Sequence, residues 1–293
     1  MRNQIIFHYD GSIAADHKIS LRTLSVTLHH LQSAIDRSYI DLAYGGVRKH
    51  ARLRSLDYPL TDFIVGVPAE GGYILDLLNT GAHAIVDRIY TAVSRAYRVA
   101  TDEALPVTQS LVEQATTRRD HLFARAQQPI DRDQLRQNYA ADRQGVRYAD
   151  RSITKEIDQV LTQLRLDRYQ DSTLELSLVG QRANPRLQFD SQLAQTFHRV
   201  VSTKSLGNPV RLEIRVRAMD RGKGKNMVGK GTHIDTGKDF TLHFRSPEDF
   251  NTLARFMRAG ADQPIVRIIA VPVIEYGTFD AEAGDMFFLA LDE

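Results

Sequence analysis

The segment 211–217 constrains the fold of this chain more than any other, because apolar and charged residues alternate there without a break. It reads Arg-Leu-Glu-Ile-Arg-Val-Arg, so that Leu212, Ile214 and Val216 share one side. Successive side chains of a strand point to opposite faces, and the pattern therefore predicts a strand with one buried and one hydrated face. The stretch 240–245 alternates in the same way. These runs predict an antiparallel sheet or a small barrel in the C-terminal part of the chain.

A period of three to four residues predicts helices elsewhere. Apolar side chains recur at that spacing from Leu21 to Leu42, and again within the segment from Ala82 to Leu166, which we expect to be mainly helical. Two short apolar runs, 63–67 and 73–78, flank a turn rich in glycine and predict a hairpin.

Taken together, the patterns predict an α+β protein in three parts. Residues 1–80 are expected to form an N-terminal α/β unit, and residues 81–170 a helical middle segment. Residues 171–293 are expected to form a C-terminal α+β sheet domain.

The composition is that of an ordinary globular protein, with 293 residues, 42% of them hydrophobic and 25% charged. It excludes collagen-like and wholly disordered chains. There is no cysteine, so disulfides, thiolate metal sites and a cysteine nucleophile are excluded. No apolar run is long enough to span a bilayer, and the first residues lack the apolar core of a secretory signal. We therefore expect a cytoplasmic protein with no membrane partner.

Positive charge is concentrated between residues 204 and 233. This stretch holds eight basic and two acidic residues, whereas the whole chain has a net charge of only +2. A glycine-rich run, 221–231, lies within it and is expected to be a loop whose backbone can approach an anion closely. Phosphate groups are the expected target, and the absence of aromatic residues in the run disfavours base stacking. The candidate anion-binding residues are Arg211, Arg215, Arg217, Arg221, Lys223, Lys225, Lys230 and Arg245.

The alternative interpretation of these residues is a solvated hairpin tip with arginines that suppress aggregation at a sheet edge. Residues 224–230 also fit the G-x-x-x-x-G-K pattern of a nucleotide phosphate loop. Gly231 stands where that loop needs Ser or Thr, and no helix pattern follows, so we reject this assignment.

Two further clusters contain residue types that can bind a metal or catalyse hydrolysis. His8, Asp10, Asp16 and His17 lie close in sequence, but their spacing matches no established metal site, and capping of backbone amides explains them better. The C-terminal segment from Glu275 is acidic, with Asp280, Glu282 and Asp285 in a turn between two predicted strands. These acids are either counter-charges to the basic segment or carboxylates of a hydrolytic site. We assign no catalytic residue, metal or cofactor.

The N-terminal part resembles a family of uncharacterised bacterial and phage-associated proteins, in which a Tyr-Asp-Gly turn precedes a histidine and a leucine-periodic helix. The matching residues are Tyr9, Asp10, Gly11, His17, Ile19, Leu21, Leu24, Leu28 and Leu31, and the turn 67–73 extends the likeness. Ser12 departs from the family, which usually has a further glycine there. The resemblance covers about the first 80 residues and implies a setting in mobile elements or phage defence, with no activity attached.

We therefore expect a non-enzymatic binding or assembly module of a phage or anti-phage system. It would contact nucleic acid through the basic C-terminal face and form homo-oligomers, or bind a protein partner, through its N-terminal and helical parts. The alternative hypothesis is a carboxylate-dependent hydrolase or nuclease.

Overall fold

The computed structural model describes residues 3–66, 72–79, 83–102, 109–140, 146–180, 184–222, 227–257 and 263–292. The α+β class predicted from the sequence is confirmed, and so is the helical character of the middle segment. The chain divides into two compact units, and each draws on separate stretches of sequence. Unit 1 comprises Met1–Val47, Ala51–Pro106 and Arg147–Ser202, and unit 2 comprises Arg48–His50, Val107–Val146 and Thr203–Glu293. Residues 81–170 therefore contribute to both units.

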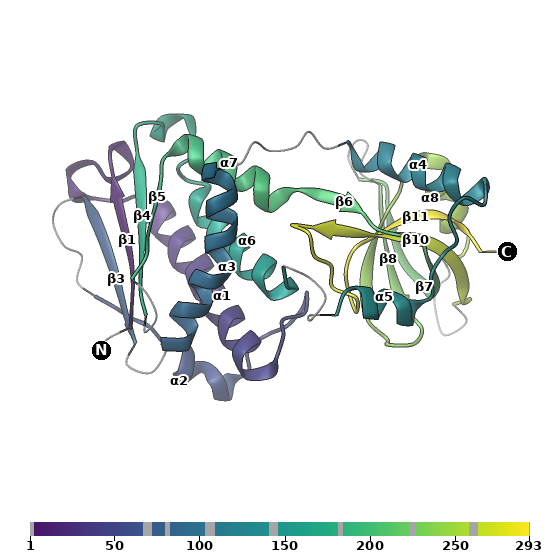
Figure 1. Ribbon diagram of the computed structural model, residues 1–293, viewed down its shortest axis with the longest axis horizontal. Helices are drawn as coiled ribbons and strands as arrows, with labels where there is room; N and C mark the ends of the chain where they lie inside the picture. The colour runs from purple at the N-terminus through teal and green to yellow at the C-terminus, as the bar shows by residue number, and fades with distance from the viewer. Residues whose placement is uncertain are drawn as a thin grey trace. The chain divides into compact units, whose positions relative to one another are not determined.

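Unit 1 is a five-stranded antiparallel sheet with helices packed on one face (Figure 1). The strand order is β2-β3-β1-β4-β5. Its strands are β1 (Asn3–Asp10), β2 (Ile64–Val65), β3 (Tyr73–Asn79), β4 (Thr173–Val179) and β5 (Arg186–Phe189). Its helices are α1 (Leu21–Tyr44), α2 (Tyr58–Thr61), α3 (His83–Asp102), α6 (Tyr148–Leu161) and α7 (Ser191–Ser202), with short 3-10 turns at Ser12–His17, Ser55–Asp57 and Asp167–Tyr169.

The core of unit 1 forms on the helix-covered side of the sheet. Ile5, Phe7 and Tyr9 alternate along β1 and are buried, as the period-two pattern of a strand requires. The hydroxyl of Tyr9 lies 2.7 Å from the hydroxyl of Thr27 on α1, so that the buried phenol is hydrogen-bonded. The predicted hairpin is confirmed, because β2 and β3 pair antiparallel. Residues 67–71 of its turn lie outside the described part of the chain.

Unit 2 contains a five-stranded barrel. Its strands follow the order β7-β8-β9-β11-β10, and the barrel closes because β10 also pairs with β7. The pair β9–β11 is parallel and the other pairs are antiparallel, so the barrel is mixed. The strands are β6 (Lys204–Leu206), β7 (Val210–Asp220), β8 (Val228–His233), β9 (Asp239–His243), β10 (Val266–Glu275) and β11 (Met286–Leu291), and β6 extends β10 outside the barrel. The helices are α4 (Leu111–Phe123), α5 (Arg132–Asn138) and α8 (Pro247–Ala254).

The long strand β7 determines the shape of the barrel. Its first half pairs with β10 and its second half with β8, and the register shifts between Val216 and Ala218. A bulge of this kind bends a strand and increases its twist, which allows a small sheet to close. The predicted alternation is confirmed, since Leu212, Ile214 and Val216 point into the barrel core.

The interior and one outer wall of the barrel are apolar. Phe250 and Leu253 of α8, and Leu135 of α5, join the interior core. Ala115 of α4 packs against a second cluster on the outer side of β10 and β11, so that this wall is covered by a helix. The outer faces of β7, β8 and β9 carry polar side chains.

The glycine-rich run 221–231 is not a loop throughout, which corrects our expectation. Residues 228–231 belong to β8. Gly231 points inward, and a Cβ atom there would lie 2.9 Å from the ring of Phe240. The absence of a side chain at this position therefore makes room for a core aromatic and not for a phosphate. Within the described ranges, no helix is long and apolar enough to cross a membrane.

Candidate nucleic-acid interface

The outer faces of β7, β8 and β9 form a mainly polar surface, which we call the β7–β9 face. Strand register places Arg215 beside Thr232, and Thr232 beside Asp239. In the next row, Lys230 of β8 lies beside Thr241 of β9. The side chains of Arg215 and Lys230 are exposed, and neither forms an ion pair within the described residues.

Arg217 belongs to the same face, but its charge is already compensated. Its Nη1 donates a hydrogen bond to Asp239 Oδ2 at 2.6 Å, and Thr232 Oγ1 donates to Asp239 Oδ1, also at 2.6 Å. Partial burial acts to raise the pKa of Asp239, but the hydrogen bonds from Thr232 and Arg217 outweigh it and hold that pKa below its usual value. Asp239 is therefore ionised at neutral pH and neutralises one of the cations on the face.

Arg221 fixes the start of the loop that joins β7 to β8. Its Nη2 donates to Asn251 Oδ1 of α8 at 2.8 Å, and its guanidinium lies 5.7 Å from the centre of the Phe250 ring. The carboxylate of Asp220 accepts a hydrogen bond from the Gly222 amide, which shapes the first turn of the loop. The predicted site residues Lys223 and Lys225 lie outside the described residues.

Arg211 and Arg245 are each paired with an aspartate that lies outside strands β7 to β9. Arg211, at the start of β7, is 3.5 Å from Asp292. Arg245 is mostly buried and pairs with Asp249 at 3.1 Å. Burial raises the pKa of Asp249 above its usual value even though Arg245 acts to lower it. Of the eight predicted residues, Arg215, Arg217, Arg221 and Lys230 are thus brought together on or beside the β7–β9 face.

The acidic C-terminal segment supplies counter-charges. Glu275 lies 2.8 Å from Lys204, and Asp292 pairs with Arg211. Glu282 accepts a hydrogen bond from Arg136 at 3.1 Å. These contacts favour the counter-charge interpretation of the segment over a hydrolytic site.

The remaining acids of the C-terminal turn are also engaged. Asp280 accepts hydrogen bonds from the backbone amides of Lys49 and Glu282 at 2.7 and 2.9 Å. Burial acts to raise the pKa of Asp285, but its contacts with His243 and Lys49 hold it far below the usual value. A carboxylate stabilised in its ionised form is a poor general acid.

Two residues of the N-terminal cluster, Asp10 and His17, accept hydrogen bonds from backbone amides. Asp10 Oδ1 accepts a hydrogen bond from the Gly11 amide, and His17 Nδ1 accepts one from the Gly72 amide. Ser20 caps α1, with its hydroxyl accepting from the Thr23 amide at 3.1 Å. Across the described residues, no three His, Asp or Glu side chains are grouped in a way that could hold a metal ion.

Comparisons with models of protein families and with curated proteins find no match to this chain. The relation of the first 80 residues to phage-associated proteins therefore stays a prediction. The geometry of the barrel in unit 2 is the basis for the function proposed below. Sequence reasoning missed Asp239, the residue that decides how much free charge the face carries. Its place opposite Thr232 follows from the pairing of β8 with β9, whereas the glycines of 228–231 are typical of a loop.

Proposed function

We propose that this protein binds single-stranded nucleic acid through the β7–β9 face and the loop 221–227, as a binding module and not as an enzyme. The observation that carries the proposal is the pair of exposed cations, Arg215 and Lys230, which form no ion pair within the described residues. Lys223 and Lys225 follow the same strand, β7, in the sequence. Exposed cations that form no close ion pair, on neighbouring strands, are suited to the regularly spaced phosphates of a nucleic-acid backbone.

The topology of the barrel supports this proposal by analogy. With β7 to β11 counted as strands one to five, the order around the barrel is 1-2-3-5-4, and helix α8 follows the third strand. This is the arrangement of OB-fold barrels, which bind oligonucleotides on strands two and three and on the loops after strands one and four. Here those elements are β8, β9, the loop 221–227 and the segment 276–285. Fold alone does not determine function, and the charged residues named above supply the specific argument.

The expected mode of binding is contact with phosphates. The outward residues of β8 are Val228, Lys230 and Thr232, and those of β9 are Asp239, Thr241 and His243. Since none is Phe, Tyr or Trp, these two strands offer no large aromatic platform for stacked bases. Binding should therefore depend strongly on salt and weakly on base sequence.

The first test is to replace Arg215 and Lys230 with glutamine and to titrate the variant with a fluorescent oligothymidine at several salt concentrations. Binding should weaken, and the slope of log K against log salt should become shallower by about 1.4, since each contact with a single strand contributes about 0.7. Arg186→Gln is the control, because this arginine of β5 is 75% exposed and lies in unit 1. If the variant has the same affinity and salt slope as the unmodified protein, the proposal is refuted.

A second variant tests the same face by a gain of affinity. Asp239→Asn retains the side-chain oxygen that accepts from Thr232 but removes the charge that neutralises Arg217. Binding should become tighter, and the salt slope should steepen by about 0.7. A folding defect cannot produce this result, so weaker or unchanged binding would contradict the role given to the face.

Self-association is the other part of the proposal. Unit 1 exposes large apolar side chains close together in sequence, at Leu56, Leu60 and Ile64, which are 86%, 56% and 73% exposed. Exposed apolar residues of this kind are typical of protein contacts. Light scattering should give a mass above the 33.1 kDa of one chain. A monomer at every concentration would refute self-association while leaving the nucleic-acid proposal intact.

A further inference from the structure

A groove of about 820 Å³ lies within unit 2, and neither Arg215 nor Lys230 lines it. It is bounded by the last turn of α4, by α8 and by the outer side of β10 and β11. Its size falls within the range of small-molecule sites. The charged residues that line it are the arginines Arg119, Arg125, Arg211 and Arg255 and the aspartates Asp249 and Asp292. The lining therefore carries a formal charge of +2.

Two of the arginines are held in place by the two aspartates. Arg119 Nη1 lies 3.3 Å from Asp249 Oδ1, and Arg119 also stacks over the ring of Phe123 at 5.2 Å. Arg211 Nε lies 3.5 Å from Asp292. A guanidinium has five N–H donors, so that each of these arginines keeps donors for a further anion.

The other two arginines account for the excess charge. Arg125 is exposed and lies two residues after the end of α4, and no ion pair involves it in the described chain. Arg255 is exposed at the end of α8, where its Nε donates only to the Thr252 carbonyl, at 2.9 Å. Neither guanidinium is neutralised by a carboxylate within the described residues, and both line the same groove.

The floor of the groove is apolar. Ile269 and Leu289, from the outer side of β10 and β11, line it together with Leu122 of α4. A cationic rim above an apolar floor is suited to a ligand with an anionic group at one end and a planar or apolar group at the other.

We propose that this groove binds a phosphomonoester joined to a planar or apolar group, as in a nucleoside monophosphate or the 5′-phosphorylated end of an oligonucleotide. A phosphomonoester carries about −1.5 to −2 charges at pH 7, which matches the charge of the lining. Its oxygens can accept the paired N–H donors of arginine, whereas a carboxylate would neutralise only half of the excess charge. The proposal is independent of the proposed function, since neither Arg215 nor Lys230 lines the groove.

The test is isothermal titration calorimetry of the full chain with adenosine monophosphate and with adenosine. Adenosine monophosphate should bind at least tenfold more tightly than adenosine. In the double variant Arg125→Gln and Arg255→Gln, the affinity for adenosine monophosphate should fall at least tenfold. Both residues are exposed, and a thermal unfolding curve like that of the unmodified protein confirms that the variant is folded.

Two controls separate this site from the β7–β9 face. The variant with Arg215→Gln and Lys230→Gln should bind adenosine monophosphate unchanged, and so should Arg186→Gln. Oligothymidine with and without a 5′-phosphate distinguishes the two sources of the phosphate: a preference for the phosphorylated strand alone identifies a strand end, and binding of the monophosphate identifies a free nucleotide. The proposal is overturned if neither phosphorylated compound binds better than its unphosphorylated counterpart, or if the groove variant binds as well as the unmodified protein.

Discussion

Lowering the pH from 7 to 5 is expected to destabilise the barrel of unit 2, and His233 is the residue that causes it. Its side chain is on β8, 3% exposed and stacked on the ring of Phe240 with 4.0 Å between ring centres. Its Nδ1 atom is buried and has no hydrogen-bond partner in the described chain. Protonation would place a positive charge in this apolar position without a partner.

The size of the effect follows from the pKa of His233. Burial is the main cause that lowers it, and the nearby charges of Arg132 and Arg136 lower it further, whereas Asp235 opposes them. The result is a pKa of about 3 in the folded chain, against 6.5 for an ordinary histidine. Between these values the unfolded chain binds more protons than the folded one, so stability falls as the pH drops below about 6.5. For these two pKa values the loss between pH 7 and pH 5 is about 2 kcal/mol.

Urea unfolding at pH 7 and pH 5 measures this loss, with tyrosine fluorescence as the signal because the chain has eleven tyrosines and no tryptophan. His233→Leu has a similar volume and cannot be protonated, so it should lose about 2 kcal/mol less than the unmodified protein over this interval. His121→Gln is the control, since this histidine of α4 is exposed. If the unmodified protein and His233→Leu lose the same free energy, the assignment to His233 is wrong.

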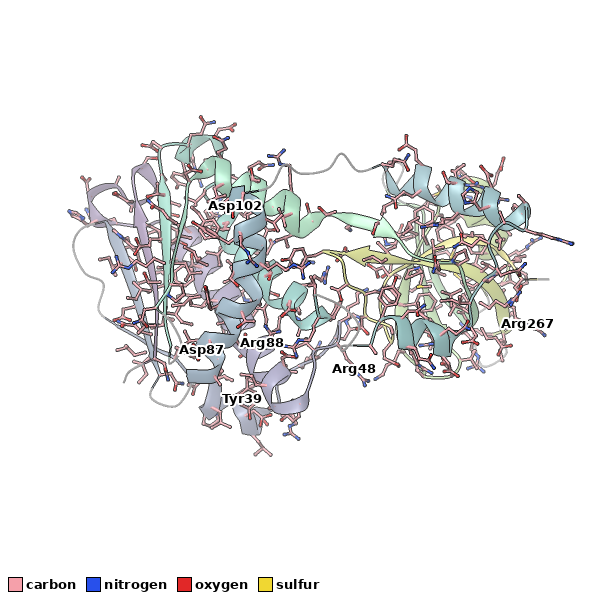
Figure 2. All side chains as sticks on the ribbon, in the orientation of Figure 1. Tyr39, Arg48, Asp87, Arg88, Asp102 and Arg267 are labelled. Carbon is pink, nitrogen blue, oxygen red and sulfur yellow. The ribbon has the colours of Figure 1, made fainter. Side chains whose placement is uncertain are left out.

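Three further substitutions test the core and turns of unit 1. Arg88, which lies among the helices in Figure 2, is 5% exposed and bonds Asp41 at 2.6 Å, so Arg88→Ala should cost about 3–5 kcal/mol in urea unfolding by leaving a buried carboxylate poorly compensated. Phe197→Ala should cost about 3–5 kcal/mol in the same assay, because this fully buried ring leaves a cavity. Gly11 has a φ of 83°, and a Cβ there would lie 2.6 Å from the Asp171 carbonyl oxygen, so Gly11→Ala should cost about 1–3 kcal/mol and lower the melting temperature measured by circular dichroism. A loss below about 0.5 kcal/mol in any of the three would contradict its structural explanation.

Local sequence patterns predict most of the helices and strands, but they do not predict which side chains of these elements are buried. The helix predicted from 21–42 is confirmed as α1, yet Leu21 and Leu42 are exposed, whereas Thr23 and Thr27 are fully buried. The hydroxyl of Thr23 lies 3.4 Å from Gln163 Oε1, and the hydroxyl of Thr27 lies 2.7 Å from the phenol of Tyr9. A buried polar residue of this kind depends on its partner in the fold, and hydrophobic periodicity contains no information about that partner.

In the candidate site, too, the sequence predicts which side chains are exposed but not how much of their charge is neutralised by neighbours. The alternation at 211–217 correctly predicted which side of β7 faces water, and it therefore placed Arg215 and Arg217 together. The free charge of that surface depends on Asp239, which reaches Arg217 across the intervening strand β8. That contact depends on strand order and register, which local sequence patterns do not determine when a glycine-rich strand is mistaken for a loop.

The pairing of β1 with β4 has a consequence for synthesis of the chain. Gln4 pairs with Val179, so β1 leaves the ribosome long before its neighbour in the sheet exists. At 5–20 residues per second the wait is roughly 10–30 s. During this time β1 can pair with β3 on one side only, and its other edge is open to strands of neighbouring nascent chains. The yield of folded protein should therefore depend on translation speed and on chaperones that cover this edge until residue 179 has emerged.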